Sequence, residues 1–322
     1  MATLLAASDL TVHFPVPGGT ARAVDGISFT VQEGEIVGMV GESGCGKSVT
    51  ALALMRLLPE RQARIGGRIE WRGQSLTDLD ETRLRKIRGR EISMIFQDPL
   101  TSLNPVFSVG EQLVEPLMQH LGLSRAAALA EARNALERVG IERPEERLGA
   151  YPSQLSGGMR QRVMIAMAMA TKPKLLIADE PTTALDVTTQ AQVLRLIDEL
   201  RRQTGTAVLF ITHDLGVVAE LCERVIVLYA GKIAESAGVA DLFNRPLHPY
   251  TRGLLRAIHT LDRGGIEAAI PGRVEPATSY PPGCRFHPRC PDVLPRCRET
   301  PPPLFIREAS QVACWLYEKV GG

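Results

Sequence analysis

The sequence has no apolar run long enough to cross a membrane. Its longest run, Val163 to Ala170, falls well short of the roughly 18 residues that a spanning helix needs. The segment Met1 to Leu10 also lacks the basic start and the apolar core of a secretion signal. We therefore expect the chain to stay in the cytosol and to cross no membrane by itself.

A charge imbalance is absent as well. The 37 Lys and Arg residues nearly match the 36 Asp and Glu residues, for a formal net charge of +1. Domains that bind nucleic acid through its phosphates are usually strongly basic, so no nucleic-acid partner is expected. The basic stretch from Arg83 to Arg90 has no aromatic residues among its charges, and we interpret it as a solvated face.

Cysteines are few, but their distribution is uneven. Of the six, four lie in the last forty residues, in a proline-rich segment: Cys284, Cys290, Cys297 and Cys314. In a reducing cytosol this clustering indicates a metal site rather than disulfides. Four thiolates suit zinc or an iron–sulfur cluster, although the sequence has no CxxC pair. Reduced structural cysteines are the third possibility.

The sequence does contain a series of short apolar runs followed by helical patterns. Strands are predicted at Ile36 to Val40, Ile92 to Phe96, Leu175 to Asp179, Ala207 to Ile211 and Val225 to Tyr229. These runs have no polar alternation, as expected for parallel strands covered on both faces. Helices are predicted at Lys47 to Leu58 and Val187 to Leu200. Edge strands are expected before Gly34, and a hairpin at Gly66 to Gly73.

The segment Gly41-Glu-Ser-Gly-Cys-Gly-Lys47-Ser48 joins a predicted strand to a predicted helix. Its glycines let the backbone bend round a phosphate chain, and the helix presents its positive end to the same anion. Lys47 is predicted to reach the β- and γ-phosphates of ATP, and the Ser48 hydroxyl to bind Mg²⁺. The predicted ATP-binding residues of this loop are Gly41, Glu42, Ser43, Gly44, Cys45, Gly46, Lys47, Ser48 and Val49.

A second cluster consists of two carboxylates, Asp179 and Glu180, at the end of a predicted strand. A parallel strand places them at the carboxyl edge of its sheet, where open α/β folds bind ligands. Asp179 is predicted to hold the Mg²⁺ shell, and Glu180 to orient or deprotonate the attacking water. The alternative is an acidic helix start, because Pro181 and Thr182 follow. Together with the phosphate loop, the cluster predicts a P-loop NTPase.

The octet Leu155-Ser-Gly-Gly-Met-Arg-Gln-Arg162 resembles the signature sequence of ABC ATPases. Physically it is another anion site, with a serine hydroxyl and glycine N–H groups at a helix start. As an alternative, Ser156 could simply cap a helix. In this family the signature of one subunit faces the phosphate loop of another, so the resemblance implies contacts with an opposing ATP. The residues concerned are Ser156, Gly157, Gly158 and Gln161.

Further positions match this family in the same order along the chain. Gln97 matches the glutamine loop, which touches Mg²⁺ and senses the transmembrane partner. The run Ala184-Leu-Asp186 matches the loop that crosses to the second ATPase, and His213 matches the switch histidine at the γ-phosphate. Phe14 lies near the position of the aromatic that stacks on adenine, although an edge strand also needs buried aromatics. The implied catalytic residues are Glu180, His213 and Gln97, and the implied Mg²⁺ ligands are Ser48, Gln97 and Asp179.

Three stretches resemble the dipeptide and oligopeptide importers within this family: Phe96 to Pro105, Asn244 to Leu255 and Gly283 to Pro291. Relatives carry dipeptides, oligopeptides, glutathione or nickel chelates. The resemblance implies an ATPase subunit at the cytoplasmic face of the inner membrane, attached only through its permeases. Its implied partners are a sister ATPase, two permease subunits and an external substrate-binding protein. A homodimeric system, a soluble non-transport ABC ATPase and a redox- or metal-sensing ATPase are the alternatives.

The implied architecture is α/β, with an ABC ATPase domain over residues 1–260 and an appendage over residues 261–322. The ATPase domain is expected to carry an N-terminal antiparallel β subdomain and an inserted helical subdomain at about residues 109–171. By resemblance, the appendage binds a 4Fe-4S cluster through Cys284, Cys290, Cys297 and Cys314. Such a cluster would staple a segment too small for a core of its own. Binding of zinc by these cysteines, or of no metal at all, are the alternatives.

Two cysteines lie outside the appendage. Cys45 is close to Lys47 at a predicted helix start, an environment that stabilises a thiolate. We therefore expect thiol reagents to inactivate the protein and bound ATP to protect it. Cys222 follows the apolar stretch Leu215 to Leu221 and is expected to be buried and inert.

Overall fold

A computed structural model describes residues 2–98, 102–183, 185–262 and 270–318 of the chain. The chain folds into two compact units, each built from several stretches of sequence. Unit 1 comprises Met1–Leu4, Val31–Glu35 and Asp78–Phe210, and unit 2 comprises Leu5–Thr30, Ile36–Thr77 and Ile211–Gly322. Among the described residues, no helix is long and apolar enough to span a bilayer.

The sheet strands of unit 1 are β6 (Ile92–Ile95), β7 (Leu175–Asp179) and β8 (Ala207–Ile211), which lie side by side in that order. Strands β6 and β7 are parallel, with Ile95 opposite Ala178. Every residue of β7 and β8 is buried, which explains their uninterrupted apolar sequences. Because β6 and β7 are parallel, the residues that follow them meet at one edge of the sheet.

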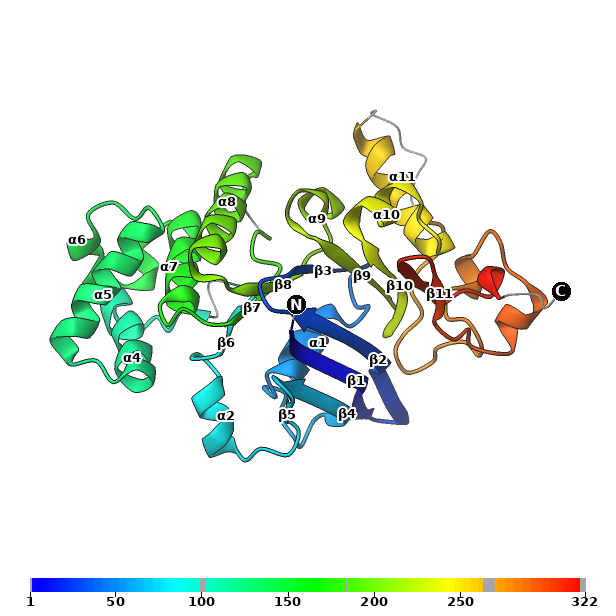
Figure 1. The fold of residues 1–322 in the computed structure, drawn as a ribbon, viewed down its shortest axis with the longest axis horizontal. Helices are drawn as coiled ribbons and strands as arrows, with labels where there is room; N and C mark the ends of the chain where they lie inside the picture. Colours follow the sequence, from blue (N-terminus) through cyan, green and yellow to red (C-terminus); the bar gives the residue numbers. More distant parts are fainter. Residues whose placement is uncertain (1, 99–101, 184, 263–269, 319–322) are drawn as a thin grey trace. The chain divides into compact units, whose positions relative to one another are not determined.

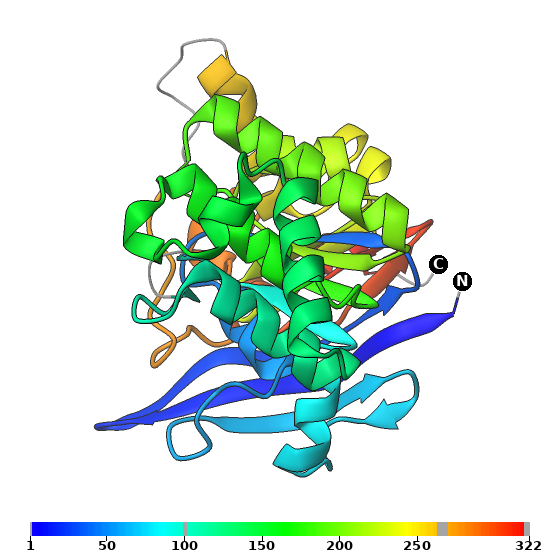
Figure 2. The ribbon, with the colours of Figure 1, turned by 90° about the vertical axis from the view of Figure 1, so that its left-hand side faces the viewer.

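Unit 1 also contains a series of helices (Figures 1 and 2). They are α2 (Glu81–Ile87), α4 (Val109–Leu121), α5 (Arg125–Arg138), α6 (Pro144–Leu148), the 3-10 turn η1 (Pro152–Gln154), α7 (Gly157–Met169) and α8 (Val187–Thr204). Helices α4 to α7 pack against one another. Serine caps define several starts: Ser108 forms a capping box with Glu111 at α4, and Ser124 caps α5.

An antiparallel sheet belongs to unit 2, apart from the ends of two strands. Its order is β2 (Gly19–Gln32), β1 (Thr3–Val16), β4 (Arg64–Trp71) and β5 (Gln74–Ser75), with the two long strands in blue in Figure 2. The hairpin expected at Gly66 to Gly73 is present, because β4 and β5 pair antiparallel across a turn at Arg72 and Gly73. Gly66 and Gly67, however, lie within β4 and not in the turn. A Cβ on Gly67 would lie 2.3 Å from the Asp9 carbonyl oxygen, so close strand approach, not a turn, requires this glycine.

The second sheet of unit 2 connects the phosphate loop to the end of the chain. Its neighbouring strands are β3 (Ile36–Val40), β9 (Arg224–Tyr229), β10 (Lys232–Gly238), β12 (Ser310–Val312) and β11 (Phe305–Arg307). Strands β3 and β9 are parallel, and β10 pairs antiparallel with both β9 and β12. The C-terminal residues therefore extend the sheet that contains β3.

The helices of unit 2 are short except for the last (Figure 1). They are α1 (Lys47–Leu54), α9 (Leu215–Leu221), α10 (Val239–Asn244), α11 (Pro249–Asp262) and the 3-10 turns η2 (His287–Arg289), η3 (Pro295–Arg298) and η4 (Trp315–Tyr317). An aromatic cluster joins strand β9, helix α11 and the residue before η2. The Tyr229 ring centroid lies 4.6 Å from that of Tyr250 and 5.1 Å from that of Phe286. Phe286 thus anchors the C-terminal segment in the core of unit 2.

Candidate ATP site and the C-terminal segment

The predicted phosphate loop connects the fully buried strand β3 to helix α1. Gly41, Gly44 and Gly46 have φ angles of +152°, +79° and +109°, which L side chains rarely adopt. A Cβ on Gly41 would lie 2.2 Å from the Leu228 carbonyl oxygen, and one on Gly46 would lie 2.5 Å from that of Ala23. The loop can therefore keep this path only with glycine at both positions.

Lys47 folds back over the loop that precedes it. Its Nζ donates to the Gly41 carbonyl oxygen at 2.8 Å and to that of Glu42 at 3.3 Å, and the residue is 5% exposed. Helix α1 begins after Gly46 without a side-chain cap, so its first N–H groups have no competing side-chain acceptor at the cap position. The Lys47 cation and the N–H groups at the start of α1 together make the loop suited to bind a polyphosphate.

Cys45 does not meet the expectation of a reactive thiolate. The residue is completely buried. Burial raises the pKa of its thiol, and the neighbouring Lys47 charge opposes this only in part. The sequence pattern correctly identifies a nearby cation, but desolvation of the thiolate is the larger effect. Cys222 is also buried, as expected, and burial raises its thiol pKa to about 12.

The two predicted carboxylates follow β7 in unit 1. Asp179 is buried at the end of the strand, and Glu180 is the next residue. The Glu180 carboxylate accepts hydrogen bonds from Gln97 Nε2 at 3.2 Å and from Thr183 Oγ1 at 2.9 Å. Gln97 follows β6, the strand beside β7. The parallel strands thus bring two predicted catalytic residues into direct contact.

Glu180 also has an unusual backbone conformation. Its φ angle is +46°, a left-handed region that costs a non-glycine residue about 1–3 kcal/mol. Such strain is concentrated at functional sites, where the surroundings hold it in place. The hydrogen bonds from Gln97 and Thr183 fix the carboxylate in this strained position.

The structure places His213 and Phe14 as follows. His213 lies two residues after β8 and is exposed, and the next residue, Asp214, caps helix α9 through the Gly216 N–H at 2.8 Å. Phe14 lies on β1 and is half-buried. Its predicted stacking on adenine, like the γ-phosphate contact of His213, stays a prediction.

The signature residues surround the start of helix α7. Ser156 is the cap residue, and its Oγ accepts from the Met159 N–H at 3.3 Å. At the same helix end, Gly157 is exposed and Gly158 is half-buried. Gln161, in contrast, is buried, with 2% of its surface exposed. Its Nε2 donates to the carbonyl of Pro181, the residue after Glu180. The structure therefore gives Gln161 an internal contact beside the carboxylates, and its role toward an opposing ATP stays a prediction.

Asp186 is the cap residue before helix α8. Its carboxylate accepts from the Thr189 N–H at 3.0 Å and the Thr189 hydroxyl at 2.7 Å. These hydrogen bonds lower the pKa of Asp186, so this exposed side chain keeps its charge. Ala184, which was predicted with it as part of the dimer loop, lies outside the described residues.

Comparison with known proteins identifies the family. Residues 24–183 match the ABC transporter family, and residues 234–297 match the family described as the oligopeptide/dipeptide transporter C-terminal region. The oligopeptide transport ATP-binding protein OppD of Salmonella typhimurium is 51% identical over 93% of this chain and 89% of its own length. The chain belongs to the ABC transporter ATP-binding family. It is an ABC-type ATPase.

Two further relatives cover nearly the whole of this ABC ATPase. A probable peptide ABC transporter ATP-binding protein of Sinorhizobium fredii, y4tR, is 53% identical over 98% of this chain and 96% of its own. The dipeptide transport ATP-binding protein DppD of Bacillus subtilis is 50% identical over 99% and 96%, respectively. The family recognised from the sequence motifs is therefore confirmed.

Solved structures of ABC cassettes share the fold. A dimeric ATP-binding cassette in a post-hydrolysis state with ADP and Pi matches with a TM-score of 0.66 and 29% identity, over 73% of this chain and 99% of that chain. The cassette cbiO1 of Clostridium perfringens matches with a TM-score of 0.63 and 27% identity, over 76% and 92%. The predicted α/β ABC ATPase fold class is thus confirmed.

The four tail cysteines of this ABC ATPase do not form a metal site in the part of the chain that the structure describes. No group of three or more Cys, His, Asp or Glu side chains there is placed to hold a metal ion. The thiols of Cys284 and Cys290 have pKa values raised to about 12 and about 11, mainly by burial and further by the other tail thiols. The predicted 4Fe-4S cluster is therefore not supported by this arrangement.

Sequence reasoning missed how the C-terminal segment reaches the ATP-binding loop. Tyr250 Oη accepts from the Glu42 N–H at 2.9 Å, and the Arg289 guanidinium forms two hydrogen bonds with the Glu42 carboxylate. The one signal in the sequence is the run from His248 to Tyr250, which lies in a stretch that resembles the peptide importers. Contacts over 247 positions of sequence separation leave no local pattern that could predict them.

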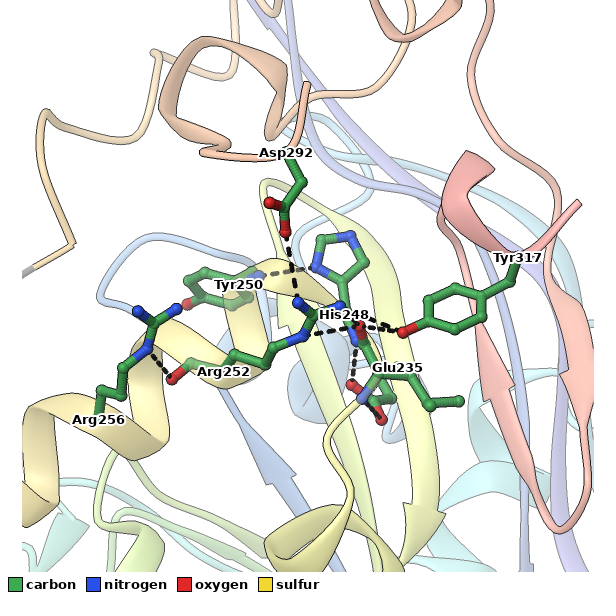
Figure 3. A network of polar contacts seen from close by, with 8 residues as sticks. Glu235, His248, Tyr250, Arg252, Arg256, Asp292 and Tyr317 are labelled. Atoms are coloured by element: carbon green, nitrogen blue, oxygen red, sulfur yellow. Dashed lines mark hydrogen bonds and ion pairs between the residues drawn. The ribbon is translucent and has the colours of Figure 1, made fainter. Parts of the chain in front are cut away.

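A polar network fixes this same run (Figure 3). Glu235 of β10 accepts from the Leu247 N–H at 2.9 Å and the His248 N–H at 2.8 Å, and His248 Nδ1 accepts from the Tyr250 N–H at 3.0 Å. Burial lowers the pKa of His248 to about 3, so the ring is neutral and can accept a hydrogen bond.

Arg252 extends this network to the end of the chain. Its guanidinium donates hydrogen bonds to the Leu247 carbonyl, to the Asp292 carboxylate and to Tyr317 Oη.

Proposed function

We propose that this chain is the ATP-hydrolysing subunit of an importer that couples ATP binding and hydrolysis to the uptake of dipeptides or oligopeptides. One observation supports this proposal above all. The same chain carries a glycine-dependent phosphate loop and a C-terminal region of the oligopeptide/dipeptide transporter family. Relatives named for peptide transport match along almost the full length.

Reconstitution with permeases and a binding protein tests the proposal. ATP hydrolysis by the complex in vesicles is expected to rise when the binding protein carries a peptide, with peptide accumulating inside. Lys47→Ala should abolish both. Stimulation by glutathione or a nickel chelate alone would replace the peptide with that solute. A rate of ATP hydrolysis that is the same with and without the permeases would indicate a soluble ABC ATPase.

The proposed roles of the ATP-site residues rest on their chemistry and position. Lys47 and the loop N–H groups bind the phosphates. The Ser48 hydroxyl, the Gln97 amide and the Asp179 carboxylate offer the oxygen ligands that Mg²⁺ prefers, and bound Mg²⁺ would neutralise phosphate charge. Glu180 orients the attacking water or takes its proton, supported by its strained, doubly hydrogen-bonded carboxylate.

The proposed partners follow from this function. An exposed signature at the start of α7 suits contact with the ATP of a second ATPase, and Asp186 would lie at the same interface. A sister ATPase, two permeases and an external binding protein complete the importer at the cytoplasmic face of the membrane. Cross-linking of Glu180→Gln protein with ATP should yield an ATPase dimer. A dimer that forms without a sister subunit would replace the heterodimer with a homodimer.

We also propose that the tail binds a 4Fe-4S cluster. The test is the iron, sulfide and zinc content of protein purified without oxygen. The support for this proposal is the resemblance and the closeness of the tail thiols, because the other three each raise the pKa of the Cys284 thiol. About four iron and four sulfide per chain, with a visible absorption band, is the expected result. Zinc would indicate a structural staple, and no metal would leave four reduced cysteines.

A further inference from the structure

One buried arginine of the C-terminal segment reaches the phosphate loop. Arg289 Nη1 lies 2.6 Å from Glu42 Oε2, and Arg289 Nη2 lies 3.0 Å from Glu42 Oε1. This is the two-bond geometry in which guanidinium and carboxylate pair most strongly. The Arg289 side chain is 5% exposed and that of Glu42 is 31% exposed, so solvent screens this pair less than an ion pair on the open surface.

The arginine is itself held firmly at the end of η2. Its Nε donates to the Pro271 carbonyl at 2.8 Å, and its Nη2 also donates to the Ile270 carbonyl at 3.1 Å. Tyr229 Oη accepts from Nη1 at 3.4 Å. With its other donors occupied, the guanidinium has few alternative positions, so it can act as a fixed anchor.

Three separate groups of Glu42 are bound. Its carboxylate pairs with Arg289, its N–H donates to Tyr250 Oη, and its carbonyl accepts from Lys47 Nζ. Tyr250 is completely buried and packs against Tyr229 and Phe286. One residue of a glycine-rich loop is thereby tied to the rigid core of unit 2 from two sides.

We propose that Arg289 is a positioning residue of the ATP site, which holds the phosphate loop in its binding conformation through Glu42 and cancels the charge of that carboxylate. The inference rests on the proposed ATP-binding role of the loop. A loop with three glycines at positive φ loses much conformational freedom on ordering, and an anchor reduces this loss before ATP binds. An unpaired carboxylate in the loop would also repel a polyphosphate.

The two effects predict a specific pattern of kinetics. Arg289→Ala should raise the KM for ATP and the Kd of a fluorescent ATP analogue by on the order of tenfold or more, the range seen when an outer-shell partner is lost. The kcat should stay within about twofold, because Arg289 contacts no predicted catalytic residue of the described chain. Arg289→Lys keeps the charge but not the two-bond geometry. Its KM and Kd should therefore lie between those of the parent protein and those of Arg289→Ala.

A double-mutant cycle separates pairing from general damage. Glu42→Gln combined with Arg289→Ala should bind ATP no worse than Arg289→Ala alone, since the unpaired charge is gone. The matched control is Arg296→Ala, which removes the 2.6 Å ion pair with Glu318 and the stacking on Trp315 in the same segment. This control should keep the KM of the parent protein.

Each other result overturns the inference. An unchanged KM in Arg289→Ala, additive losses in the cycle, or an equal loss in Arg296→Ala would each do so. If Arg289→Ala does not fold, Arg289→Lys, which keeps the charge and most of the volume, decides through its KM. Parent protein that neither binds ATP nor responds to Lys47→Ala would instead overturn the proposed function.

Discussion

At the residue scale, Glu180 combines a strained backbone with two side-chain partners. Gln97 and Thr183 hold its carboxylate, and its φ angle is +46°. The residue is therefore fixed before any substrate arrives, as a group that orients water needs to be.

Glu180→Gln should keep ATP affinity and lose ATP turnover by about 10²–10⁴-fold, the usual contribution of a general base. Glu199→Gln, the same change at an exposed position of α8, is the control and should hydrolyse ATP normally. Equilibrium binding and single-turnover hydrolysis measure the two properties. Turnover near that of the parent would remove Glu180 from the mechanism.

The buried Cys45 thiol should react slowly with iodoacetamide. Because burial raises its pKa, the thiolate fraction at pH 8 is small, and reagent access is blocked. Mass spectrometry is expected to find labelling at least tenfold slower in the native than in the unfolded protein, in line with control of reactivity by thiolate and exposure. Rapid labelling of the native protein, with protection by ATP, would instead support the prediction from sequence that Cys45 is a reactive thiolate.

At the scale of elements, helix starts carry both stability and function. Ser156 caps α7 and Ser124 caps α5 with the same geometry, each accepting from the N–H three residues on at 3.3 Å. The two serines therefore form a natural pair for separating a cap from a nucleotide contact.

Ser156→Ala and Ser124→Ala should each lower the free energy of unfolding by about 1 kcal/mol. Only Ser156→Ala should also reduce ATP hydrolysis by the assembled transporter, because only that helix start carries the signature. Chemical denaturation and ATPase assays on the same preparations compare them. Equal activity in both variants would reduce Ser156 to a cap.

Elements buried on both faces were predictable from sequence, and those set by distant contacts were not. The strands at Ile36–Val40, Leu175–Asp179 and Ala207–Ile211 coincide with the predicted runs, since a continuous apolar run needs no partner to be recognised. The turn of the predicted hairpin lies at Arg72 and Gly73, whereas Gly66 and Gly67 serve the close approach of β1. Glycine permits a turn, but it equally permits a backbone to pass nearby.

At the scale of the whole chain, the C-terminal segment was predicted to be a separate appendage, and that boundary near residue 260 stays a prediction. The structure adds that this segment supplies β12, which pairs with β10 at Glu235 and Val312. Proline content described its loops correctly, but composition cannot reveal which sheet a three-residue strand will join.

Asp25 of β2 links the same segment to the antiparallel sheet and predicts a pH dependence. It pairs with Arg285 and Lys232. Burial opposes its charge, yet these cations lower its pKa below the ordinary 3.8. A lowered folded-state pKa gives stability that is complete above the unfolded pKa and is lost as pH falls through the folded one.

The thermal midpoint of Asp25→Asn should therefore lie below that of the parent from pH 7 to about pH 5, and the gap should narrow below about pH 4, near the unfolded carboxyl pKa. Melting curves at closely spaced pH values measure this. A gap that stays constant down to pH 3 would show that packing, rather than charge, accounts for the loss.

The contact between Glu42 and Arg289 spans 247 positions, which has a consequence for synthesis. A ribosome adds about 5–20 residues per second, so the phosphate loop emerges roughly 12–50 s before its anchor exists. During that interval the nascent chain holds an unanchored loop beside an unpaired carboxylate. Full affinity for nucleotide is thus acquired only after Arg289 has been added, which limits unproductive ATP binding by shorter nascent chains.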